Sequence, residues 1–509
     1  MFVPLTVNDF LKRAETVYAD RIAVVDEPDQ PATSFGPLTY RELAAAARAM
    51  AAALDDLGVP IGGRVAIASQ NSARLLTSFY GVSGSGRVLV PINFRLAEPE
   101  VRYIVEHSGA QVLLVDPELD GPLSTVTAKH RFVLGESDDI IFPEGRIGKE
   151  WTPDENATAT INYTSGTTAR PKGVQLTHRN VWMNAVTFAL HVTMSDRDVL
   201  LHTLPMFHAN GWGTPYAITG VGGRHIVLRK VDGAEILRRV EEHGVTFMCG
   251  APAVWSAVLD AAATWEGPIP GRDRVRIVVA GAPPPTRTIE RIETELGWEF
   301  IQIYGLTETA PMLTVNRRRS EWDGLDVHER AKMLGRAGVP ALGVDLDVDP
   351  SGEILARGNV VLESYWDQPD QSQEALAGGW FHTGDGGTYD DGYLTISDRK
   401  KDVIISGGEN VSSIEVEDVI ANHPNVREVA VVGTPDDRWG EAVTALIVTD
   451  GSALTADDII AHCRASLAGY KCPKRVEFRE ALPRTSTGKL QKFLLRQDFW
   501  TGQERSIKG

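Results

Sequence analysis

Short runs of consecutive apolar residues recur along most of the chain and restrict its fold more than any other feature. Because each run is continuous rather than alternating, it predicts a strand that is buried on both faces. Helix-like segments separate the runs, so the pattern predicts an α/β fold in which helices cover the sheets. The expected strands are residues 64–69, 112–116, 198–203, 225–230, 245–250 and 276–281.

One of the helix-like segments shows both of its ends in the sequence. Thr39 and Glu42 have the spacing of a capping box, in which each side chain accepts a hydrogen bond from the backbone of the other residue. An alanine-rich segment follows and runs to Gly58, a residue type that often ends helices. We expect one helix between these two signals.

The sequence changes character near residue 385. Glycine, aspartate and serine become frequent, and we expect a hairpin that turns at Asp391-Gly392. Two strands, 427–433 and 442–448, and a helix follow. About 110 residues can form a small domain of their own. The expected domains are 1–399, a large N-terminal domain of helix-covered β-sheets, and 400–509, a small mobile α+β C-terminal domain.

Length, charge and cysteine content exclude several classes of protein. A chain of 509 residues is too long for one ordinary core. Its net charge of −17 argues against binding to nucleic acid or to anionic lipid. Cys249, Cys463 and Cys472 are widely spaced, which fits a reducing cytoplasm and gives no metal-ligand spacing. We see neither a signal-peptide pattern nor about 20 consecutive apolar residues, and we expect a cytoplasmic protein without membrane insertion.

The segment YTSGTTARPKGV, residues 163–174, has the composition of a phosphate-binding loop. Gly166 and Lys172 have the separation of a Walker-type loop, but Pro171 and Gly173 depart from that motif. Glycines, hydroxyl groups and a lysine still suit a polyphosphate, because backbone N–H groups and a cation can surround it. A solvated surface loop explains the same composition, so this segment alone leaves both interpretations open.

Three further motifs accompany this loop: QIYGLTETAP at 302–311, WFHTGDGG at 380–387 and PRTSTGKLQK at 483–492. With these four motifs in register over nearly its whole length, the chain resembles the adenylate-forming superfamily of acyl-CoA synthetases, adenylation domains and luciferases. It looks most similar to ligases for fatty, short-chain or aryl acids. The resemblance implies an ATP-dependent acyl-CoA ligase, an acid–thiol ligase that forms an acyl-AMP, releases pyrophosphate and passes the acyl group to coenzyme A. It implies ATP, Mg²⁺ and coenzyme A as cofactors and co-substrates.

The resemblance also assigns nucleotide-binding roles. It implies that Tyr304 stacks on adenine, Asp385 binds the ribose hydroxyls and Arg399 contacts ribose and phosphate. Thr307 is expected at the α-phosphate, and Glu308 is expected to hold Mg²⁺. The phosphate loop comprises Thr164, Ser165, Gly166, Thr167, Thr168 and Lys172, and the residues beside the adenine and the acyl carbonyl are Gly281, Ala282, Pro283, Gln302 and Gly305.

The resemblance also implies a rotation of the C-terminal domain between the two steps. By resemblance Lys489 is the lysine that bridges the carboxylate and the α-phosphate during adenylation, and Lys401 is the hinge. Rotation about Lys401 then replaces Lys489 by Ser406, Gly407 and Gly408 on the coenzyme A side. Turn-forming and solvated charged residues explain the same local patterns outside this family.

The acyl pocket is expected at HTLPMFHANGWG, residues 202–213. The resemblance places His208 at the gate, and Trp212 either lines the pocket or packs in the core. A lining indole shortens the cavity and favours short, medium or aromatic acids. Basic residues are missing from this segment, which argues against dicarboxylates.

Two alternative functions stay open in the sequence. The enzyme can deliver its acyl group to a separate carrier protein or to a non-thiol nucleophile. A non-catalytic nucleotide-binding relative is the other alternative, although Lys172, Glu308, Asp385, Arg399 and Lys489 are all present. The expected partners are small molecules, namely a carboxylic acid, ATP and coenzyme A, and a homodimer is one assembly that the sequence leaves open.

Overall fold

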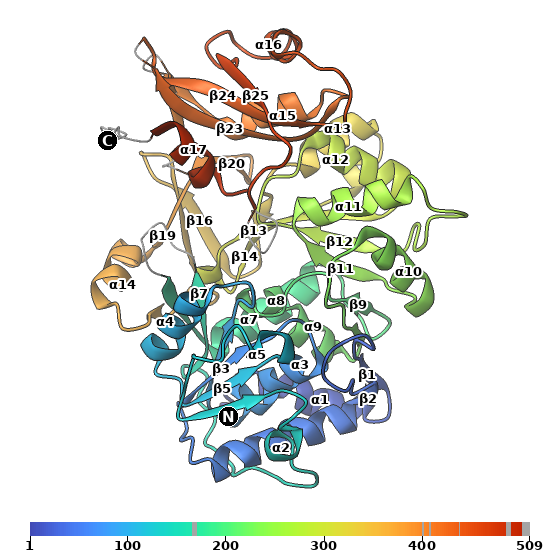
Figure 1. Cartoon of the computed structure of the whole chain (residues 1–509), viewed down its shortest axis with the longest axis vertical. Coiled ribbons are helices and arrows are strands. Elements are labelled where there is room, and N and C mark those ends of the chain that lie inside the picture. Colours follow the sequence, from blue (N-terminus) through green and yellow to red (C-terminus); the bar gives the residue numbers. More distant parts are fainter. Residues whose placement is uncertain (165–170, 400–401, 407–408, 437, 485–489, 501–509) are drawn as a thin grey trace.

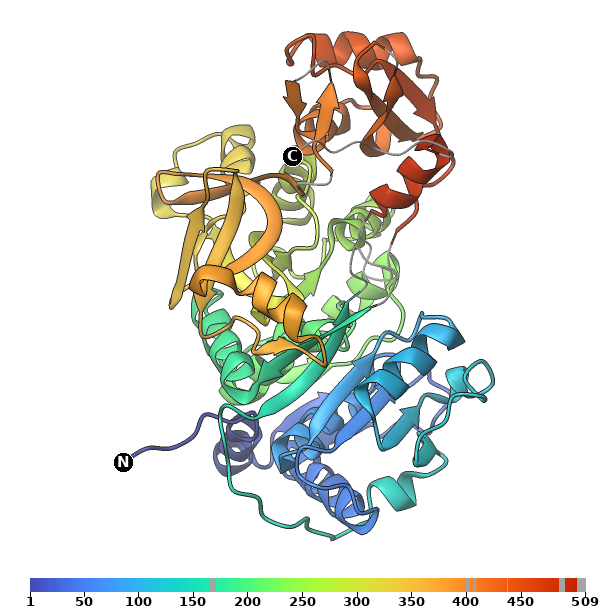
Figure 2. The same ribbon diagram turned by 90° about the vertical axis from the view of Figure 1, so that its left-hand side faces the viewer.

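The structure, a computed structural model, describes residues 1–164, 171–399, 402–406, 409–436, 438–484 and 490–500. A large N-terminal part holds three sheets, and a smaller C-terminal part holds one. The smaller part, orange to red in Figure 1, lies at one end of the molecule, and Figure 2 shows the same arrangement from the side. The predicted fold class is thereby confirmed. Among the described residues, no helix is long and apolar enough to cross a membrane.

The first sheet of the large part has nine strands. Its central strands are parallel, and antiparallel strands complete both edges. In spatial order the strands are β15 (Val339–Pro340), β14 (Met312–Arg317), β13 (Glu299–Gly305), β12 (Arg276–Val279), β11 (Phe247–Gly250), β9 (Val199–Leu201), β10 (Arg224–Ile226), β1 (Ile22–Val25) and β2 (Pro37–Thr39).

The second sheet has seven strands, and the third has four. In the second sheet, neighbouring strands from β6 to β7 are parallel. Strand β8 is antiparallel to β7, and β18 is antiparallel to β8. Its order is β18 (Ser364–Tyr365), β8 (Lys172–Thr177), β7 (Thr158–Thr164), β4 (Val88–Ile92), β3 (Arg64–Ala68), β5 (Val112–Val115) and β6 (His130–Val133). The antiparallel third sheet is β16 (Val344–Val348), β17 (Glu353–Gly358), β19 (Phe381–Asp390) and β20 (Tyr393–Arg399).

Helices cover the two large sheets on both faces. The larger part contains α1 (Asn8–Tyr18), α2 (Tyr40–Asp56), α3 (Ala73–Gly81), α4 (Glu98–Ser108), α5 (Pro117–Asp120), α6 (Asp138–Ile141), α7 (His178–His191), α8 (Ala209–Trp212), α9 (Thr214–Val221), α10 (Gly233–His243), α11 (Pro252–Ala262), α12 (Thr286–Arg291), α13 (Val327–Leu334) and α14 (Pro369–Ala375). Residues of α2, α3, α7 and α9 share one core with both sheets, whereas α10 to α13 cover the outer face of the first sheet and α4 that of the second.

The strands are buried on both faces, as the continuous apolar runs predict. In β3, Val65 and Ile67 join the central core, and Ala66 and Ala68 join the core under α4. All six expected strands occur within a few residues of their predicted bounds. The capping box of α2 is also confirmed, because the Thr39 N–H donates to Glu42 and the Glu42 N–H donates to Thr39 Oγ1.

The C-terminal part has a core of its own and follows the predicted order of elements. Its elements are β21 (Ile404–Ser406), β22 (Glu409–Val411), α15 (Ser413–Ala421), β23 (Val426–Asp436), β24 (Gly440–Thr449), α16 (Ala456–Arg464), β25 (Arg475–Phe478) and α17 (Lys492–Trp500). The hairpin before it turns at Asp391 and Gly392, with φ of 48° and 77°. The expected boundary after residue 399 coincides with the end of β20, and as a domain limit it stays a prediction.

Candidate active site

Two of the motifs predicted to bind the nucleotide leave the first sheet at the same edge. Strands β12 and β13 are parallel neighbours, with Val279 opposite Gln302, so the segments that follow them start side by side. The carboxyl ends of parallel strands are where open α/β sheets bind ligands. Gly281 has a φ of 89°, which lets the turn 281–283 pass over this edge. Gln302 is buried, and its Oε1 has no hydrogen-bond partner among the described residues, which leaves an acceptor for a ligand.

Tyr304 and Asp385 meet at this edge although 81 residues separate them. The Tyr304 hydroxyl donates to Asp385 Oδ2 over 3.0 Å. Both side chains are largely buried, at 8% and 7% exposed. Asp385 lies on β19 opposite Arg399 of β20, so the backbones of the two residues expected at the ribose are paired. The structure therefore fixes one carboxylate beside the expected adenine-stacking ring.

The turn after β13 presents Thr307 and Glu308. A short 3₁₀ turn, η3 (Thr307–Thr309), follows the strand, and Thr309 Oγ1 accepts a hydrogen bond from the Leu306 N–H over 3.0 Å. Gly305 has to be glycine, because a Cβ there would lie 1.6 Å from the Pro311 carbonyl oxygen. The close turn leaves the side chains of Thr307 and Glu308 half-buried at the sheet edge.

Glu308 and Lys172 both contact Tyr365. The Tyr365 hydroxyl donates to Glu308 Oε1 over 3.0 Å, and Lys172 Nζ lies 4.8 Å from the centre of the Tyr365 ring. Burial raises the pKa of Tyr365, and the nearby Glu308 carboxylate raises it further, so the phenol stays protonated as a donor. Lys172 pairs with Thr164 across β7 and β8, and Ser165, Gly166, Thr167 and Thr168 lie outside the described residues.

The acyl segment forms an unusual turn between β9 and α9, and this turn includes the short element α8. Ala209, Asn210, Gly211, Trp212 and Gly213 all have positive φ values, between 37° and 77°. L-residues rarely adopt this left-handed conformation in succession. Trp212 is 4% exposed and belongs to the central core, so its burial fits a pocket wall as well as ordinary packing.

Two buried asparagines hold this turn in place. Asn184 Nδ2 donates to the Trp212 carbonyl over 3.1 Å, and Asn184 Oδ1 accepts from the Met312 N–H over 3.1 Å. Asn210 Oδ1 accepts from Thr160 Oγ1 over 3.2 Å. The turn is thus linked to β7 before the phosphate loop and to β14 after Glu308. His208, just ahead of the turn, is half-buried with its ring edge-to-face against Phe207.

The residues predicted in the C-terminal part are only partly described. Ser406 ends β21 and is 3% exposed, and Arg399 is described only through its backbone in β20. Lys401, Gly407, Gly408 and Lys489 lie outside the described residues. Their roles stay predictions.

Two family models match successive parts of the chain. A family model described as AMP-binding enzyme matches residues 11–366, and one described as AMP-binding enzyme C-terminal domain matches residues 415–489. The chain belongs to the AMP-binding enzyme family. The resemblance inferred from the four motifs is confirmed.

The relatives of this AMP-binding enzyme match it from end to end. It is 37% identical over 529 residues to 4-hydroxybutyrate–CoA ligase 2 of Metallosphaera sedula, which covers 97% of this chain and 94% of that protein. The peroxisomal acetate/butyrate–CoA ligase AAE7 of Arabidopsis thaliana is 36% identical over 549 residues, with the same shares covered. The crystal structure of an anthranilate CoA ligase in complex with anthranoyl-AMP superposes with a TM-score of 0.87 at 27% identity, over 98% of each chain.

AMP-binding enzymes of this reaction class use Mg²⁺, and the residues of this site fit the ion. Glu308 offers a half-buried carboxylate, and Thr307 beside it offers a hydroxyl. No group of three or more His, Cys, Asp or Glu side chains that could hold a metal is found within the described ranges. One carboxylate suits Mg²⁺, which is usually held by one or two carboxylates together with substrate phosphates.

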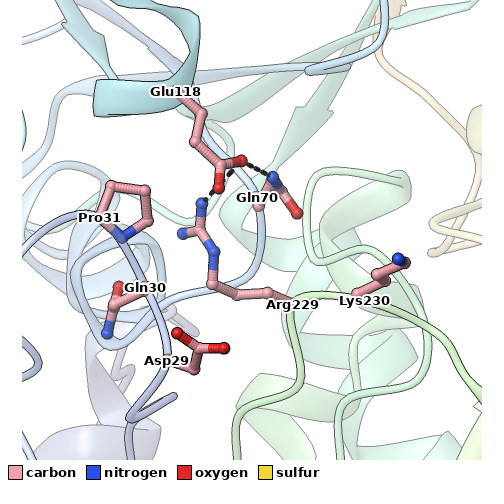
Figure 3. Close-up of a pocket in the computed structure, with 7 residues that line it drawn as sticks. All are labelled: Asp29, Gln30, Pro31, Gln70, Glu118, Arg229 and Lys230. Atoms are coloured by element: carbon pink, nitrogen blue, oxygen red, sulfur yellow. Dashed lines mark hydrogen bonds and ion pairs between the residues drawn. The ribbon is translucent and has the colours of Figure 1, made fainter.

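A hollow of about 560 Å³ lies elsewhere in the AMP-binding enzyme, at the carboxyl ends of β3, β5 and β10 (Figure 3). Arg229 in this hollow is bonded to both oxygens of Asp116, at 2.9 and 3.0 Å, and lies 3.4 Å from Glu118. A guanidinium that already faces two carboxylates has little capacity left for a phosphate. We therefore interpret the hollow as a polar seam between the two large sheets.

Two residues of this site have no signal in the sequence. Tyr365 belongs to a strand of two residues, and Asn184 lies on the buried face of α7. Asn184 accepts a hydrogen bond from the Met312 N–H, and the Tyr365 ring faces Lys172, so each contacts a residue more than a hundred positions away in the sequence. Only tertiary structure brings such contacts together.

Proposed function

We propose that this AMP-binding enzyme carries out both steps of acyl-CoA ligation in one site, at the carboxyl ends of β12 and β13. The chain is an ATP-dependent acid–thiol ligase that joins a carboxylic acid to AMP, releases pyrophosphate and transfers the acyl group to coenzyme A. The observation that best supports this location is the hydrogen bond between Tyr304 and Asp385, which joins two nucleotide motifs from different sheets.

In the first step, Asp385 and Tyr304 bind the adenosine. A carboxylate accepts two hydrogen bonds at once, which suits the two ribose hydroxyls. The Tyr304 hydroxyl donates to Asp385 Oδ2 and so orients this carboxylate. Arg399, next to Asp385 in the sheet, is proposed to reach the ribose and phosphate, and Gln302 supplies its buried Oε1 beside the adenine.

The phosphates are proposed to lie between Lys172, Thr307 and Glu308. Lys172 and residues 164–168 surround the leaving pyrophosphate, and Thr307 donates to the α-phosphate. Mg²⁺ bound by Glu308 supplies positive charge that offsets the negative charge of the phosphates. Lys489 adds a second cation between the carboxylate and the α-phosphate as charge develops there. The step needs no general base, because the carboxylate is already ionised.

The second step is proposed to follow a rotation of residues 400–509 about Lys401. Lys489 leaves the site, and the segment 406–408 faces it and forms the entry for the thiol. One site then serves two reactions through a domain motion. Delivery to a carrier protein in place of free coenzyme A is the alternative acceptor.

The proposed substrate is a short-chain, medium-chain or aryl carboxylic acid. The buried indole of Trp212 beside the left-handed turn limits the depth of the pocket, with His208 at its mouth. Relatives named for 4-hydroxybutyrate, for acetate and butyrate, and for anthranilate support acids of this size. A cytoplasmic location and a homodimer are further predictions, and one of these relatives is named as peroxisomal.

Pyrophosphate release tests the function directly. We would measure it against acids from acetate to decanoate, benzoate, cinnamate and malonate, with and without coenzyme A. We expect release with short or aryl acids and continued turnover only with coenzyme A. Release that coenzyme A fails to accelerate would favour a carrier protein, and the lack of release with every acid would contradict the proposal.

Lys489→Ala separates the two steps. We expect adenylate formation to fall by about 100-fold or more, because one cation of the transition state is lost. Thioester formation from preformed acyl-AMP should change little. Lys474→Ala is the control, since that lysine also lies in the C-terminal part, where its Nζ donates to the Gly469 carbonyl over 2.8 Å and lies 5.9 Å from the centre of the Trp439 ring. An equal loss of both steps in Lys489→Ala would refute the two-orientation model.

A further inference from the structure

Tyr365 is the side chain that two functional groups of the ATP site share. Its hydroxyl donates to Glu308 Oε1 over 3.0 Å, and its ring face lies 4.8 Å from Lys172 Nζ. Glu308 follows the end of the first sheet, whereas Lys172 begins a strand of the second. Tyr365 therefore spans the junction of the two sheets at the point where the phosphates are proposed to bind.

The backbone around Tyr365 fixes the position of its ring. Tyr365 pairs with Val174 in the ladder between β18 and β8, and its N–H donates to Ser372 Oγ over 2.9 Å. The next residue, Trp366, donates its N–H to the Gly173 carbonyl over 2.7 Å. The residue is 7% exposed. The backbone bonds on both sides of Tyr365 and the burial of its side chain keep the ring in one place, where the two charged groups contact it.

We propose that Tyr365 is a positioning residue of the ATP site, which orients the Glu308 carboxylate through its hydroxyl and the Lys172 ammonium through its ring face. This inference rests on the proposed function, in which Glu308 holds Mg²⁺ and Lys172 meets the phosphates. A phenol that donates to one oxygen of a carboxylate restricts the orientation of that carboxylate, and in the proposed function this carboxylate holds the ion. A cation over an aromatic face is attracted by the π electrons, so the flexible lysine is held where the phosphate arrives.

The two contacts belong to different parts of the side chain and can be removed one at a time. Tyr365→Phe removes the hydroxyl and keeps the ring, so it should affect Glu308 alone. Tyr365→Leu removes both. Tyr40→Phe is the matched control, because Tyr40 is a buried tyrosine at the start of α2, away from the site, and its hydroxyl donates to the Gly223 carbonyl over 2.5 Å.

The test measures ATP binding by titration calorimetry at a series of Mg²⁺ concentrations, together with the Mg²⁺ dependence of pyrophosphate release. For Tyr365→Phe we expect the Mg²⁺ concentration at half-effect to rise about three- to tenfold, with near-normal ATP affinity and kcat at saturating Mg²⁺. For Tyr365→Leu we expect a further loss of about tenfold in ATP affinity that saturating Mg²⁺ does not restore. Tyr40→Phe should match the unaltered enzyme in both measurements.

Each outcome decides between positioning and plain packing. If Tyr365→Phe lowers thermal stability or kcat but leaves the Mg²⁺ dependence unchanged, Tyr365 only packs and the inference is wrong. If both variants change the Mg²⁺ dependence equally and leave ATP affinity intact, the Lys172 part of the inference is wrong. Failure of the proposed function is separate, because the unaltered enzyme would then release no pyrophosphate with any acid.

Discussion

Trp212 combines deep burial with a backbone conformation that a large residue rarely adopts, a φ of 58°. Glycine adopts this conformation freely, so Trp212→Gly removes the indole without adding backbone strain. We expect the preference among straight-chain acids to move toward longer chains, with kcat/KM for octanoate relative to butyrate rising by about tenfold or more. Kinetics with acids of two to ten carbons measure this shift.

Stability loss alone must not be mistaken for a change of pocket. Trp255 is fully buried in the core outside the first sheet and serves as the control. Trp255→Ala should cost about 3–5 kcal/mol, like other large-to-small core changes, and leave the chain-length preference unchanged. An unchanged preference in Trp212→Gly would show that this indole is a core residue only.

At the level of single residues, the sequence predicts roles for the residues that lie in distinctive local motifs. Tyr304 and Asp385 stand in distinctive motifs, and the structure brings these two side chains into contact. Tyr365 and Asn184 could not be predicted, because an ordinary tyrosine in a two-residue strand and an ordinary helix asparagine acquire partners only through tertiary packing. Lys489 and Lys401 lie outside the described residues, so their roles rest on the motif alone.

The left-handed turn of residues 209–213 is the element on which the acyl segment depends. Gly213 has a φ of 77°, and a Cβ there would lie 2.2 Å from Asn184 Nδ2, the donor that holds the Trp212 carbonyl. Gly213→Ala therefore adds strain and displaces that donor. We expect a loss of about 2–4 kcal/mol in the free energy of unfolding, measured in urea, and a higher KM for the acid.

A second glycine separates strain from displacement. Gly62 has a φ of 74°, and no atom lies within 4 Å of the Cβ position. Gly62→Ala should cost only about 1–2 kcal/mol, the left-handed penalty, and leave the KM for the acid unchanged. If Gly213→Ala and Gly62→Ala lower the free energy of unfolding equally, the contact between residue 213 and Asn184 does not contribute to stability.

Elements with their own signals were predictable, and elements formed by distant contacts were not. The helix from Tyr40 follows from its capping box and alanine content, and the buried strands follow from their apolar runs. The turn at 209–213 includes Ala209 and Trp212, which rarely adopt a left-handed backbone, so local propensity does not indicate five such residues in succession. Buried hydrogen bonds from Asn184 and Thr160 stabilise it instead.

At the scale of the molecule, few side-chain hydrogen bonds among the described residues join the C-terminal part to the sheet edge that bears the site. Asp418 on α15 accepts from the Thr286 N–H over 2.9 Å at the start of α12, and Arg287 Nη1 donates to the His423 carbonyl over 3.0 Å. An interface of a few polar contacts suits the rotation that we propose between the two steps. The sequence predicts such a part from its separate core, but its orientation depends on side chains from distant segments.

Three buried histidines make the whole molecule sensitive to acid. His202 Nε2 lies 3.0 Å from His225 Nδ1, and His178 is buried beneath α1 with its Nδ1 accepting from the Val7 N–H. Burial lowers the pKa of His202 to about 3 and of His178 to about 4, and burial and His202 lower the pKa of His225 well below its usual range. An unfolded chain regains the ordinary histidine pKa of about 6.5.

Stability should therefore fall as the pH drops below about 6.5, because the unfolded chain then binds protons that the folded protein does not. Each of these histidines should cost about 1 kcal/mol of unfolding free energy between pH 7 and pH 5.5. Urea unfolding at the two pH values measures the loss. His178→Gln removes one titrating group and should reduce the loss by about one histidine's share. His225→Gln should do the same independently, since His178 bonds to the Val7 N–H, whereas His225 bonds to His202 and Thr219. A pH dependence that both variants leave unchanged would mean that these histidines bind no protons on unfolding in this range, and that carboxylates alone account for any acid sensitivity.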